Sequence, residues 1–397
     1  MTKLEVIENE STLNELHTDW TRLGAAATPM QSPQWMLAWW HAHQGLQDRL
    51  FVLALRDENN ELIGLVPWYR HASVALGTTI RFLGSGKACS DYQTLLCRPG
   101  SEQSVVREVT QWLSRHHRAN ERGELSSVPR WDLLDLEGVS ESDLVMNSFV
   151  NSMGEREHVT HRRPSESTWR IDLSGGWSGF LSRQSKTQRS QTRNFINRFD
   201  KSSNLSVRFA SQELLQADSM VSAMMELHQM RWRAVGVEGC FADNRMKSFF
   251  EAAMREMLTC GSAEIVLLER SHRPVAAQAW LIQDGSVYLY QSGRDPAEDA
   301  NRVGRIATSV ALRWACEQGF QAVDFLRGDE SYKSQMRAEP TLGHRVRIVA
   351  RANFPELRHK LWLACREVKT RWQELRRPAK RDGAQVTAEE NNSAAVS

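Results

Sequence analysis

The most suggestive stretch for chemistry in this sequence is the run Asp324-Phe-Leu-Arg-Gly-Asp-Glu-Ser-Tyr-Lys333. An apolar segment that reads as a buried strand ends here, and chemically versatile side chains follow it at once. A solvated loop with surface ion pairs would have a similar composition, but a polar loop that also carries Gly and Tyr after an apolar strand favours a functional site. An arginine–carboxylate pair can orient a substrate, a carboxylate can accept a proton and a lysine can hold an anion. The candidate residues are Arg327, Asp329, Glu330, Tyr332 and Lys333.

A second candidate site lies where an alternating strand, Val287–Gln291, ends in Ser292 and Gly293. A glycine at a strand end lets the backbone turn or lets a ligand approach closely. The following helix opens with Gly304 and Arg305, and a glycine with basic residues at a helix N-terminus suits a phosphate or pyrophosphate. Each signal is weak alone, because ordinary strand ends and helix starts have the same residues.

Two smaller constellations are open to both a functional and a structural interpretation. His228, Arg231 and Trp232 are spaced to share one helix face. They would contact a substrate, or Trp232 would anchor the core while Arg231 extends to solvent. Asp91 and Tyr92 follow a glycine turn and would form a base with a positioning phenol, or simply a polar loop.

Two segments are rich in positive charge. Between Arg183 and Arg208 there are seven Lys or Arg residues and one acid, and Arg189 and Arg193 would align on a helix. They would bind phosphates of coenzyme A, of tRNA or of a lipid-linked sugar, or form a solvated basic face. The segment Glu356–Arg381 is basic and amphipathic. That pattern is typical of a helix on a membrane surface or a partner, and also of a helix packed on a sheet.

The bulk properties exclude several classes of protein. The 397 residues carry a formal charge of +2, so composition alone does not indicate a nucleic-acid binder. Six scattered cysteines form no C-x-x-C pair, so we expect reduced thiols and no metal site. The sequence starts without an apolar leader and has no long apolar stretch, so we expect a cytoplasmic protein, with peripheral contact to the inner membrane left open. The motifs of serine hydrolases, P-loop proteins, zincins and dinucleotide-binding folds are absent.

The elements that must position these residues occur twice in the same order. Each half reads as helices, an antiparallel meander, a helix and a further strand, so two copies of one α/β unit explain the chain best. The best-marked elements of the first half begin with a tryptophan-rich helix, where Ser32 fits an N-cap and Pro33 the first helical position. They are followed by strands and one helix at Phe51–Arg56, Glu61–Tyr69, Thr79–Leu83, Glu102–His116 and Trp131–Leu136.

The second half opens with helices at Phe180–Phe199 and Leu214–Ala234. An Asp-Gly turn joins its second and third strands, a strong hairpin signal. The remaining elements are strands Glu264–Arg270, Val275–Gln283 and Ser286–Ser292, helix Arg302–Gln318 and strand Ala322–Leu326. We expect the halves at residues 1–160 and 165–352, divided in the polar stretch Arg156–Thr168, then a basic amphipathic helix at 353–380 and a disordered tail at 381–397.

Several of these motifs, taken in order, resemble one family. They are Gln31-Ser-Pro-Gln-Trp35, Arg81-Phe-Leu-Gly-Ser-Gly86 with Ser90-Asp-Tyr92, Leu227-His-Gln-Met-Arg-Trp232, Tyr290-Gln-Ser-Gly293 and the run Asp324–Lys333. From Gln31 to Ala350 the chain resembles the CelD-like (cellulose-biosynthesis) acetyltransferases of the GNAT superfamily. The resemblance implies an α/β fold of two tandem GNAT-like units with mixed, largely antiparallel sheets, related to the FemAB aminoacyltransferases. It also implies acyl transfer from acyl-CoA, with acetyl-CoA as co-substrate, to an amine or hydroxyl of a small molecule or saccharide, in contact with a synthase complex.

From these motifs we predict direct acyl transfer, without a covalent enzyme intermediate, and the following roles. The donor would lie over Gln291, Ser292 and Gly293, with its phosphates near Gly304, Arg305, Arg189 and Arg193. Asp329, or else Asp91, would deprotonate an acceptor positioned by Arg327, Tyr332 and Lys333, and the substrate would contact His228, Arg231, Trp232 and Tyr92. GNAT phosphate loops usually read Q/R-x-x-G-x-G/A, whereas Asn301 and Ile306 stand at the outer positions here. An aminoacyl-tRNA donor, or a non-catalytic module that binds RNA, anionic lipid or a synthase partner, is therefore the alternative.

Overall fold

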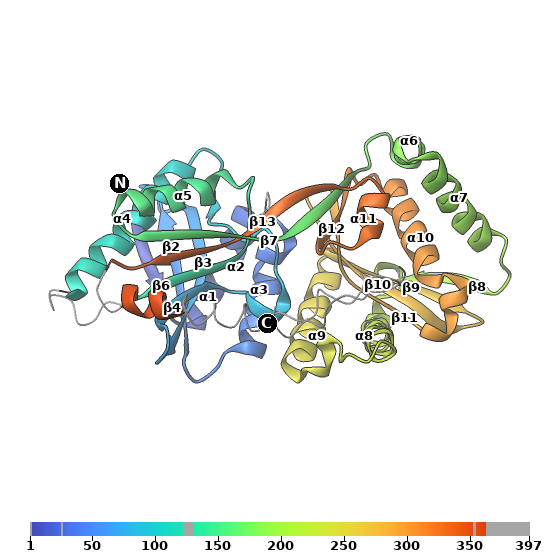
Figure 1. The fold of residues 1–397 in the computed structure, drawn as a ribbon, viewed down its shortest axis with the longest axis horizontal. Helices are drawn as coiled ribbons and strands as arrows, with labels where there is room; N and C mark the ends of the chain where they lie inside the picture. Colours follow the sequence, from blue (N-terminus) through green and yellow to red (C-terminus); the bar gives the residue numbers. More distant parts are fainter. Residues whose placement is uncertain (1, 25–26, 122–130, 352–354, 363–397) are drawn as a thin grey trace, which may run out of the picture.

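The computed structural model describes residues 2–24, 27–121, 131–351 and 355–362. They form a mixed α/β structure of two halves joined side by side (Figure 1). The two expected sheets are in fact one: a single 13-stranded sheet runs through the described residues in the order β1-β2-β3-β4-β6-β13-β7-β12-β11-β10-β9-β8, with β5 paired to β3.

The first half contains an antiparallel meander, to which one further strand is added in parallel, with helices on both faces. Its strands are β1 (Lys3–Ile7), β2 (Asp48–Arg56), β3 (Leu62–Ser73), β4 (Gly77–Phe82), β5 (Leu96–Cys97) and β6 (Leu133–Ser140). Its helices are α1 (Glu10–Glu15), α2 (His17–Leu23), α3 (Pro33–His43), α4 (Glu102–Glu121) and α5 (Leu144–Glu155). The hairpins and the α3 and α4 helices lie where the sequence predicts them.

The second half repeats this order. Its strands are β8 (Leu205–Phe209), β9 (Ala263–Arg270), β10 (Arg273–Gln283), β11 (Ser286–Arg294) and β12 (Ala322–Arg327). Its helices are α6 (Gly176–Arg183), α7 (Lys186–Asp200), α8 (Ala217–Arg233), α9 (Asn244–Thr259), α10 (Val303–Glu317) and α11 (Ser331–Gln335). In Figure 1, α6, α7 and α10 cover one face of this half, and α8 and α9 cover the other.

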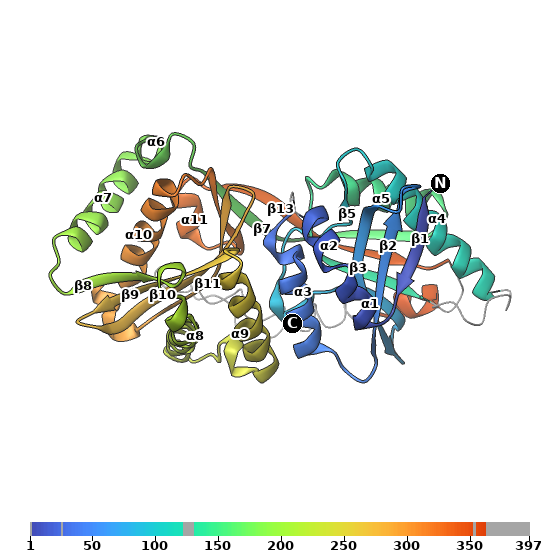
Figure 2. The same ribbon diagram turned by 180° about the vertical axis from the view of Figure 1, so that it is seen from behind.

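Two long strands are shared by the halves. β7 (Val159–Asp172) pairs with β12 in the second half, while β13 (Glu339–Val349) pairs with β6 in the first half, and both pair with each other along their length. Figure 2 shows them crossing together from one half to the other. The polar stretch 156–168, expected to divide the halves, is thus largely a strand that connects them.

Three further differences from the sequence prediction have local causes. The single helix expected over Phe180–Phe199 is two helices, because Ser185 caps α7 by accepting a hydrogen bond from the backbone of Gln188. Helix α9, which the sequence reading missed, presents Met246, Phe249 and other apolar residues to the core. The basic helix expected at 353–380 is helical over 355–362, and the rest of that segment and the tail lie outside the described residues.

Apolar residues of both halves meet at the interface and form one hydrophobic cluster. Helix α3 begins at the Ser32 N-cap, whose side chain accepts from the backbone of Trp35, and it buries Trp35, Trp39 and Trp40. Trp35 meets Phe249 of α9 and Tyr290 of β11, each edge to face with ring centroids 4.8 Å apart. Because these aromatic contacts are buried, the two halves form a continuous packing unit. No described helix is long and apolar enough to cross a membrane.

One pair of strands opens a gap in the sheet of the second half. β11 and β12 run parallel but pair only from Ser286 with Ala322 to Tyr288 with Asp324. Beyond that point β11 continues to Arg294 and β12 to Arg327 without pairing to each other. The end of β11 therefore offers unpaired backbone groups toward this gap, which lies at the same end of the sheet as the run Asp324–Lys333.

Candidate active site

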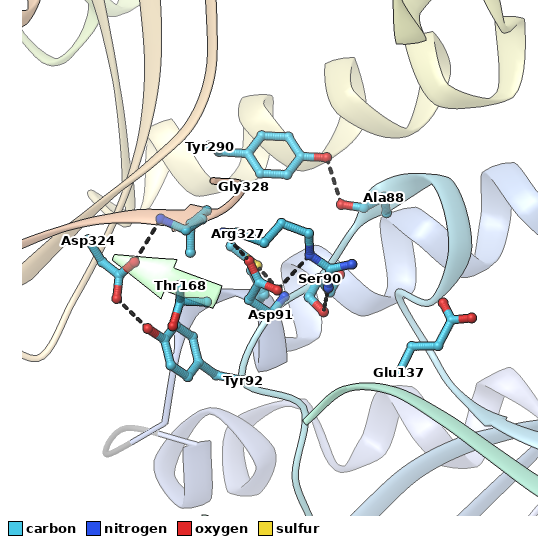
Figure 3. A network of polar contacts seen from close by, with 12 residues as sticks. Ala88, Ser90, Asp91, Tyr92, Glu137, Thr168, Tyr290, Asp324, Arg327 and Gly328 are labelled. Atoms are coloured by element: carbon cyan, nitrogen blue, oxygen red, sulfur yellow. Dashed lines mark hydrogen bonds and ion pairs between the residues drawn. The ribbon is translucent and has the colours of Figure 1, made fainter. Parts of the chain in front are cut away.

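A loop of the first half is tied to the end of β12 in the second half (Figure 3). The carboxylate of Asp91 accepts from the Arg327 Nε at 2.7 Å and from the Arg327 backbone N–H at 2.9 Å. A second guanidinium nitrogen of Arg327 donates to the carbonyl oxygen of Ser90 at 3.1 Å. Asp91 is buried, and its two bonds to Arg327 make it a positioning group rather than a free base. The site is therefore composite, with one wall from each half.

Further contacts hold the same loop in place. Trp35 of α3 donates its indole N–H to the Ser90 hydroxyl at 2.9 Å, and Tyr290 of β11 donates its hydroxyl to the carbonyl of Ala88 at 3.0 Å. Cys89, between them, has a positive φ of 50° and is exposed. A non-glycine residue in that region is held there by its surroundings, and such residues gather at functional sites. Trp35 thus links the Gln31–Trp35 motif to the site.

Tyr92 and Asp324 form a second link between the halves. The Tyr92 hydroxyl donates to one oxygen of Asp324 (Figure 3), and the other oxygen accepts from the backbone N–H of Leu326 at 2.7 Å. Asp324 is fully buried, and burial raises the pKa of its carboxyl to about 6. Burial also raises the pKa of the Tyr92 phenol, so Tyr92 remains a donor. Tyr92 therefore positions the loop rather than contacting a substrate through its hydroxyl.

The raised pKa of Asp324 makes stability depend on pH. The folded carboxyl has a pKa of about 6 against an ordinary 3.8. The stabilisation that the protonated Asp324 carboxyl gives to the fold is therefore fully present below the ordinary pKa, and it is lost as the pH rises through about 6. Asp324→Asn stays uncharged, so we expect it to be more stable than wild type at neutral pH, by about 3 kcal/mol at most. Urea unfolding across this pH range measures the difference in free energy of unfolding between Asp324→Asn and wild type. This difference should disappear at acidic pH, and a difference that does not change with pH would contradict the prediction.

Lys333 has a different role from the expected one. Its side chain is 1% exposed, and its ammonium donates to the carbonyl oxygens of Leu326, Arg327 and Gly328 at 3.2, 2.8 and 3.0 Å. It also pairs with Glu330 at 2.8 Å. The three donors of the ammonium are thus occupied by groups of the protein itself, so none is left for a phosphate or carboxylate of a substrate. The structure corrects the prediction: Lys333 shapes the loop that carries Arg327 and Asp329.

The open side of this loop is acidic. Asp329 is exposed, and Glu166 on β7 is half-buried; neither has a hydrogen-bond or ion-pair partner among the residues that the structure describes. The pKa of Glu166 is raised, mainly by burial and then by the nearby carboxylates of Asp329, Glu330 and Asp91, while Arg327 opposes this. Glu166 was not among the predicted site residues because this stretch was interpreted as a linker: the residues around it are almost all polar and show no alternation of apolar and polar side chains that would mark a strand.

The strand on the other side of the gap carries a bulge. Ala279 of β10 pairs with Gln291 and Trp280 pairs with Leu289, so Tyr290 is an extra residue in β11. A bulge leaves backbone groups outside the ladder and is common beside active sites. Gln291 and Ser292, which follow it, are half-buried, and Arg231 of α8 donates to the Ser292 hydroxyl at 3.3 Å. Arg231, predicted to contact the substrate, thus lies beside Ser292, predicted to contact the donor.

His228 and Gly293 are explained by packing. His228 is buried; its Nε2 accepts from the indole N–H of Trp232 at 2.9 Å, and burial lowers its pKa to about 4, so it is neutral at pH 7. A Cβ on Gly293 would lie 2.2 Å from the backbone nitrogen of His228. Gly293 is therefore required for the close approach of α8 to β11 rather than for a ligand, and His228 is a positioning residue.

The N-terminus of α10 lies beside the end of β11 and the loop after β12, and its first-turn N–H groups could bind an anion. Its N-cap, Arg302, has a φ of 56° and supplies no side-chain cap. A Cβ on Gly304 would meet only the Arg294 side chain, at 3.4 Å, so the approach to the first turn is open. The guanidinium of Arg305 lies 5.5 Å from the centre of the Tyr332 ring, which joins this helix to the loop after β12.

Arg189 and Arg193 are not part of this arrangement. Arg189 lines a separate pocket with Arg337 and Glu339, beside the start of α7. The residue next to the α10 start, Asn301, is instead contacted by Arg198 at the other end of α7. Arg193 is exposed on the same helix. The structure thus corrects the prediction that Arg189 and Arg193 join Gly304 around one set of phosphates.

Comparison with known proteins finds a family match in the second half. Residues 186–334 match the family model of the acetyltransferase (GNAT) domain. No curated protein matches the sequence. Among solved structures, FemX resembles the chain with a TM-score of 0.56 and 9% identity, covering 86% of this chain and 96% of FemX.

Two further structures have a similar likeness. One is the C-terminal domain of a protein described as a lysylphosphatidylglycerol synthetase from Agrobacterium fabrum, with a TM-score of 0.52 and 9% identity over 89% of this chain and 96% of that one. The other is a protein of unknown function from Bacteroides thetaiotaomicron, with a TM-score of 0.52 and 10% identity over 87% of this chain and 100% of that one. At these identities the likeness concerns the fold. The predicted α/β fold with two halves of the same element order is confirmed, and residues 186–334 in the second half match the model of the acetyltransferase (GNAT) domain.

Proposed function

We propose that the protein transfers an acyl group from acyl-CoA to an amine at the composite site between its halves. The observation that carries the proposal is the bond between Asp91 and Arg327, which places a loop of the first half at the open end of the GNAT domain, beside the gap between β11 and β12. The resemblance to CelD-like proteins favours acetyl as the acyl group and a saccharide or other cell-envelope precursor as acceptor.

The donor would occupy the gap. Its extended arm would hydrogen-bond to the unpaired edge of β11 after Tyr288, as an added strand does. Its pyrophosphate would lie at the N-terminus of α10, near Gly304 and Arg305, where outward N–H groups favour an anion. The bulge at Tyr290 would supply a backbone N–H for the thioester carbonyl, whose oxygen becomes negative as the acceptor adds.

The acceptor would enter from the acidic side. Glu166 and Asp329, whose carboxylates have no partner within the described ranges, favour a cationic amine over a neutral hydroxyl. Glu166 would take a proton from the ammonium, since a carboxyl with a raised pKa is better matched to this task. The amine then attacks the carbonyl carbon, the carbon–sulfur bond breaks, and the thiolate of coenzyme A receives a proton. Burial raises the pKa of Tyr332, so its phenol stays protonated and would donate a hydrogen bond to this thiolate, which takes the second proton that the nitrogen loses as the amide forms.

A thermal-shift experiment tests the donor. Acetyl-CoA should raise the melting temperature of the wild type, because a ligand that binds only the native state stabilises it. In Gly304→Glu this shift should disappear, since the new carboxylate would lie at the proposed pyrophosphate position. Gly154→Glu is the matched control: this exposed glycine of α5 in the first half also lies in a helix, a Cβ there would meet only the Thr160 side chain at 3.9 Å, and the shift should be retained. If no acyl-CoA of any chain length stabilises the wild type, the proposal fails.

A second candidate differs only in the donor. The outer positions of the phosphate loop, Asn301 and Ile306, depart from the usual GNAT pattern, and the fold resembles that of FemX. FemAB-like relatives take their acyl group from aminoacyl-tRNA. Stabilisation by charged tRNA but not by acetyl-CoA, in the same experiment, would favour this donor.

A further inference from the structure

A basic pocket opens at the far end of α7. It has a volume of about 550 Å³ and lies between the α6–α7 junction and the connection from α11 to β13. This end of α7 is remote from Asn301 and the start of α10, which Arg198 contacts from the opposite end of the helix. The charged residues that line the pocket are Arg183, Lys186, Arg189, Arg337 and Glu339.

Among the described residues that line this pocket, positive charges outnumber negative ones. Four cations face one carboxylate, Glu339. Arg183 is occupied by the carbonyl oxygens of Asp172 and Ser174, at 2.8 Å each, and its charge is paired with the Asp172 carboxylate at 3.5 Å. Lys186 and Arg337 have no hydrogen-bond or ion-pair partner in the described part of the chain. Like charges gathered in a concave site repel one another and raise the local potential for an anion.

Polar groups in the pocket wall are also without partners. Gln184 is 3% exposed, and its amide oxygen is buried without a hydrogen bond. The Nε of Arg189 is likewise buried and unpaired, although another of its nitrogens donates to the Gln184 carbonyl at 3.2 Å. A half-turn of the Gln184 amide exchanges its oxygen and its nitrogen, so this side chain can present its NH2 group at the same place. Buried polar groups of this kind usually have a partner, which here would be the ligand.

The first turn of α7 adds to the same environment. The helix has 15 residues, and the Ser185 hydroxyl caps it by accepting a hydrogen bond from the backbone N–H of Gln188. The remaining first-turn N–H groups and the positive end of the helix dipole favour an anion in front of Lys186. Basic side chains thus line the pocket from the α6–α7 junction, from the body of α7 and from the segment that contains Arg337.

We propose that this pocket binds a phosphate group, separately from the acyl donor. Phosphate carries up to two negative charges and accepts hydrogen bonds in several directions, which matches guanidinium, ammonium and backbone donors that converge from different segments. The phosphate belongs to a lipid headgroup or to a small soluble compound. The pocket would anchor that molecule or the membrane that contains it, whichever donor the acyltransferase uses.

Calorimetric titration of the full-length protein with inorganic phosphate, and flotation with vesicles, distinguish the sources. The vesicles contain phosphatidylcholine alone or with phosphatidylglycerol, at constant ionic strength. The test variant is Lys186→Gln with Arg337→Gln, and the matched control, which also removes two charges, is Arg193→Gln with Lys201→Gln, two exposed cations of α7 and its C-terminal end. We expect binding to weaken at least about tenfold in the test variant and not in the control.

Each result decides the proposal. Binding of inorganic phosphate that the test variant loses supports a soluble ligand, and binding of only the anionic vesicles, lost in the same way, supports a lipid headgroup. Absence of binding to both probes overturns the proposal, as does equal binding by the test variant and wild type. Circular dichroism checks that the test variant is folded, and Arg337→Lys, which keeps the charge, should bind more tightly than Arg337→Gln.

Discussion

Replacing Glu166 with glutamine is expected to lower kcat by about a hundredfold or more, the usual contribution of a general base. Glutamine keeps the size of the side chain but cannot accept the proton of an ammonium. The base acts when deprotonated, and the pKa of Glu166 is raised by burial and by its acidic neighbours. The wild-type rate should therefore rise with pH through a value above that of an ordinary glutamate, and Glu166→Gln should lose this rise. Steady-state kinetics across acidic and neutral pH measure both effects.

Two further variants make this prediction specific. Glu226→Gln alters an exposed carboxylate of α8 and should leave the rate unchanged. Asp329→Asn tests the base that the sequence analysis favoured, and it should have a smaller effect than Glu166→Gln. If Asp329→Asn instead abolishes the pH dependence while Glu166→Gln retains it, the base is Asp329 and the assignment of Glu166 is wrong.

Lys333→Met is expected to reduce the free energy of unfolding by about 3–5 kcal/mol and to abolish activity together with it. The three carbonyl oxygens that the ammonium now satisfies, of Leu326, Arg327 and Gly328, would remain buried without a donor. The loop that holds Arg327 against Asp91 would then lose its shape. Urea unfolding gives the loss of stability, and the same preparations give the rate.

An exposed lysine provides the matched control. Lys247→Met removes a surface ion pair with Glu251 at 3.9 Å and should cost at most about 1 kcal/mol. A Lys333→Met protein of wild-type stability with a raised KM for one substrate would show that Lys333 contacts that substrate. The two roles for Lys333 are thus separated by stability rather than by activity.

Much of the fold was predictable where local signals are strong. Ser32 and Pro33 mark the start of α3, and the turn Asp284-Gly285 joins β10 to β11, as predicted. β7 was not predictable in this way, because its polar side chains resemble a linker and only a few, such as Ile171, are buried. Its strand conformation depends on pairing with β13, whose partner residues lie far away in the sequence. Such tertiary pairing overrides local propensity.

The candidate site was predictable in composition but not in the direction of its side chains. The run Asp324–Lys333 does lie at the end of a strand beside a gap in the sheet. The sequence could not tell that Lys333 points inward, or that Gly293 serves helix packing. Nor could it pair Asp91 with Arg327 across 236 residues, since that contact exists only once both halves are assembled.

The strands that cross between the halves limit how this protein can be divided. Without β13 the first half would expose the edge of β6, and without β7 the second half would expose the edge of β12. An exposed edge of this kind readily pairs with other chains, so either half produced alone should aggregate. Evolution and engineering can therefore exchange the loops around the substrates, but they cannot exchange one half as an independent module. Heating should melt the whole molecule in one cooperative transition.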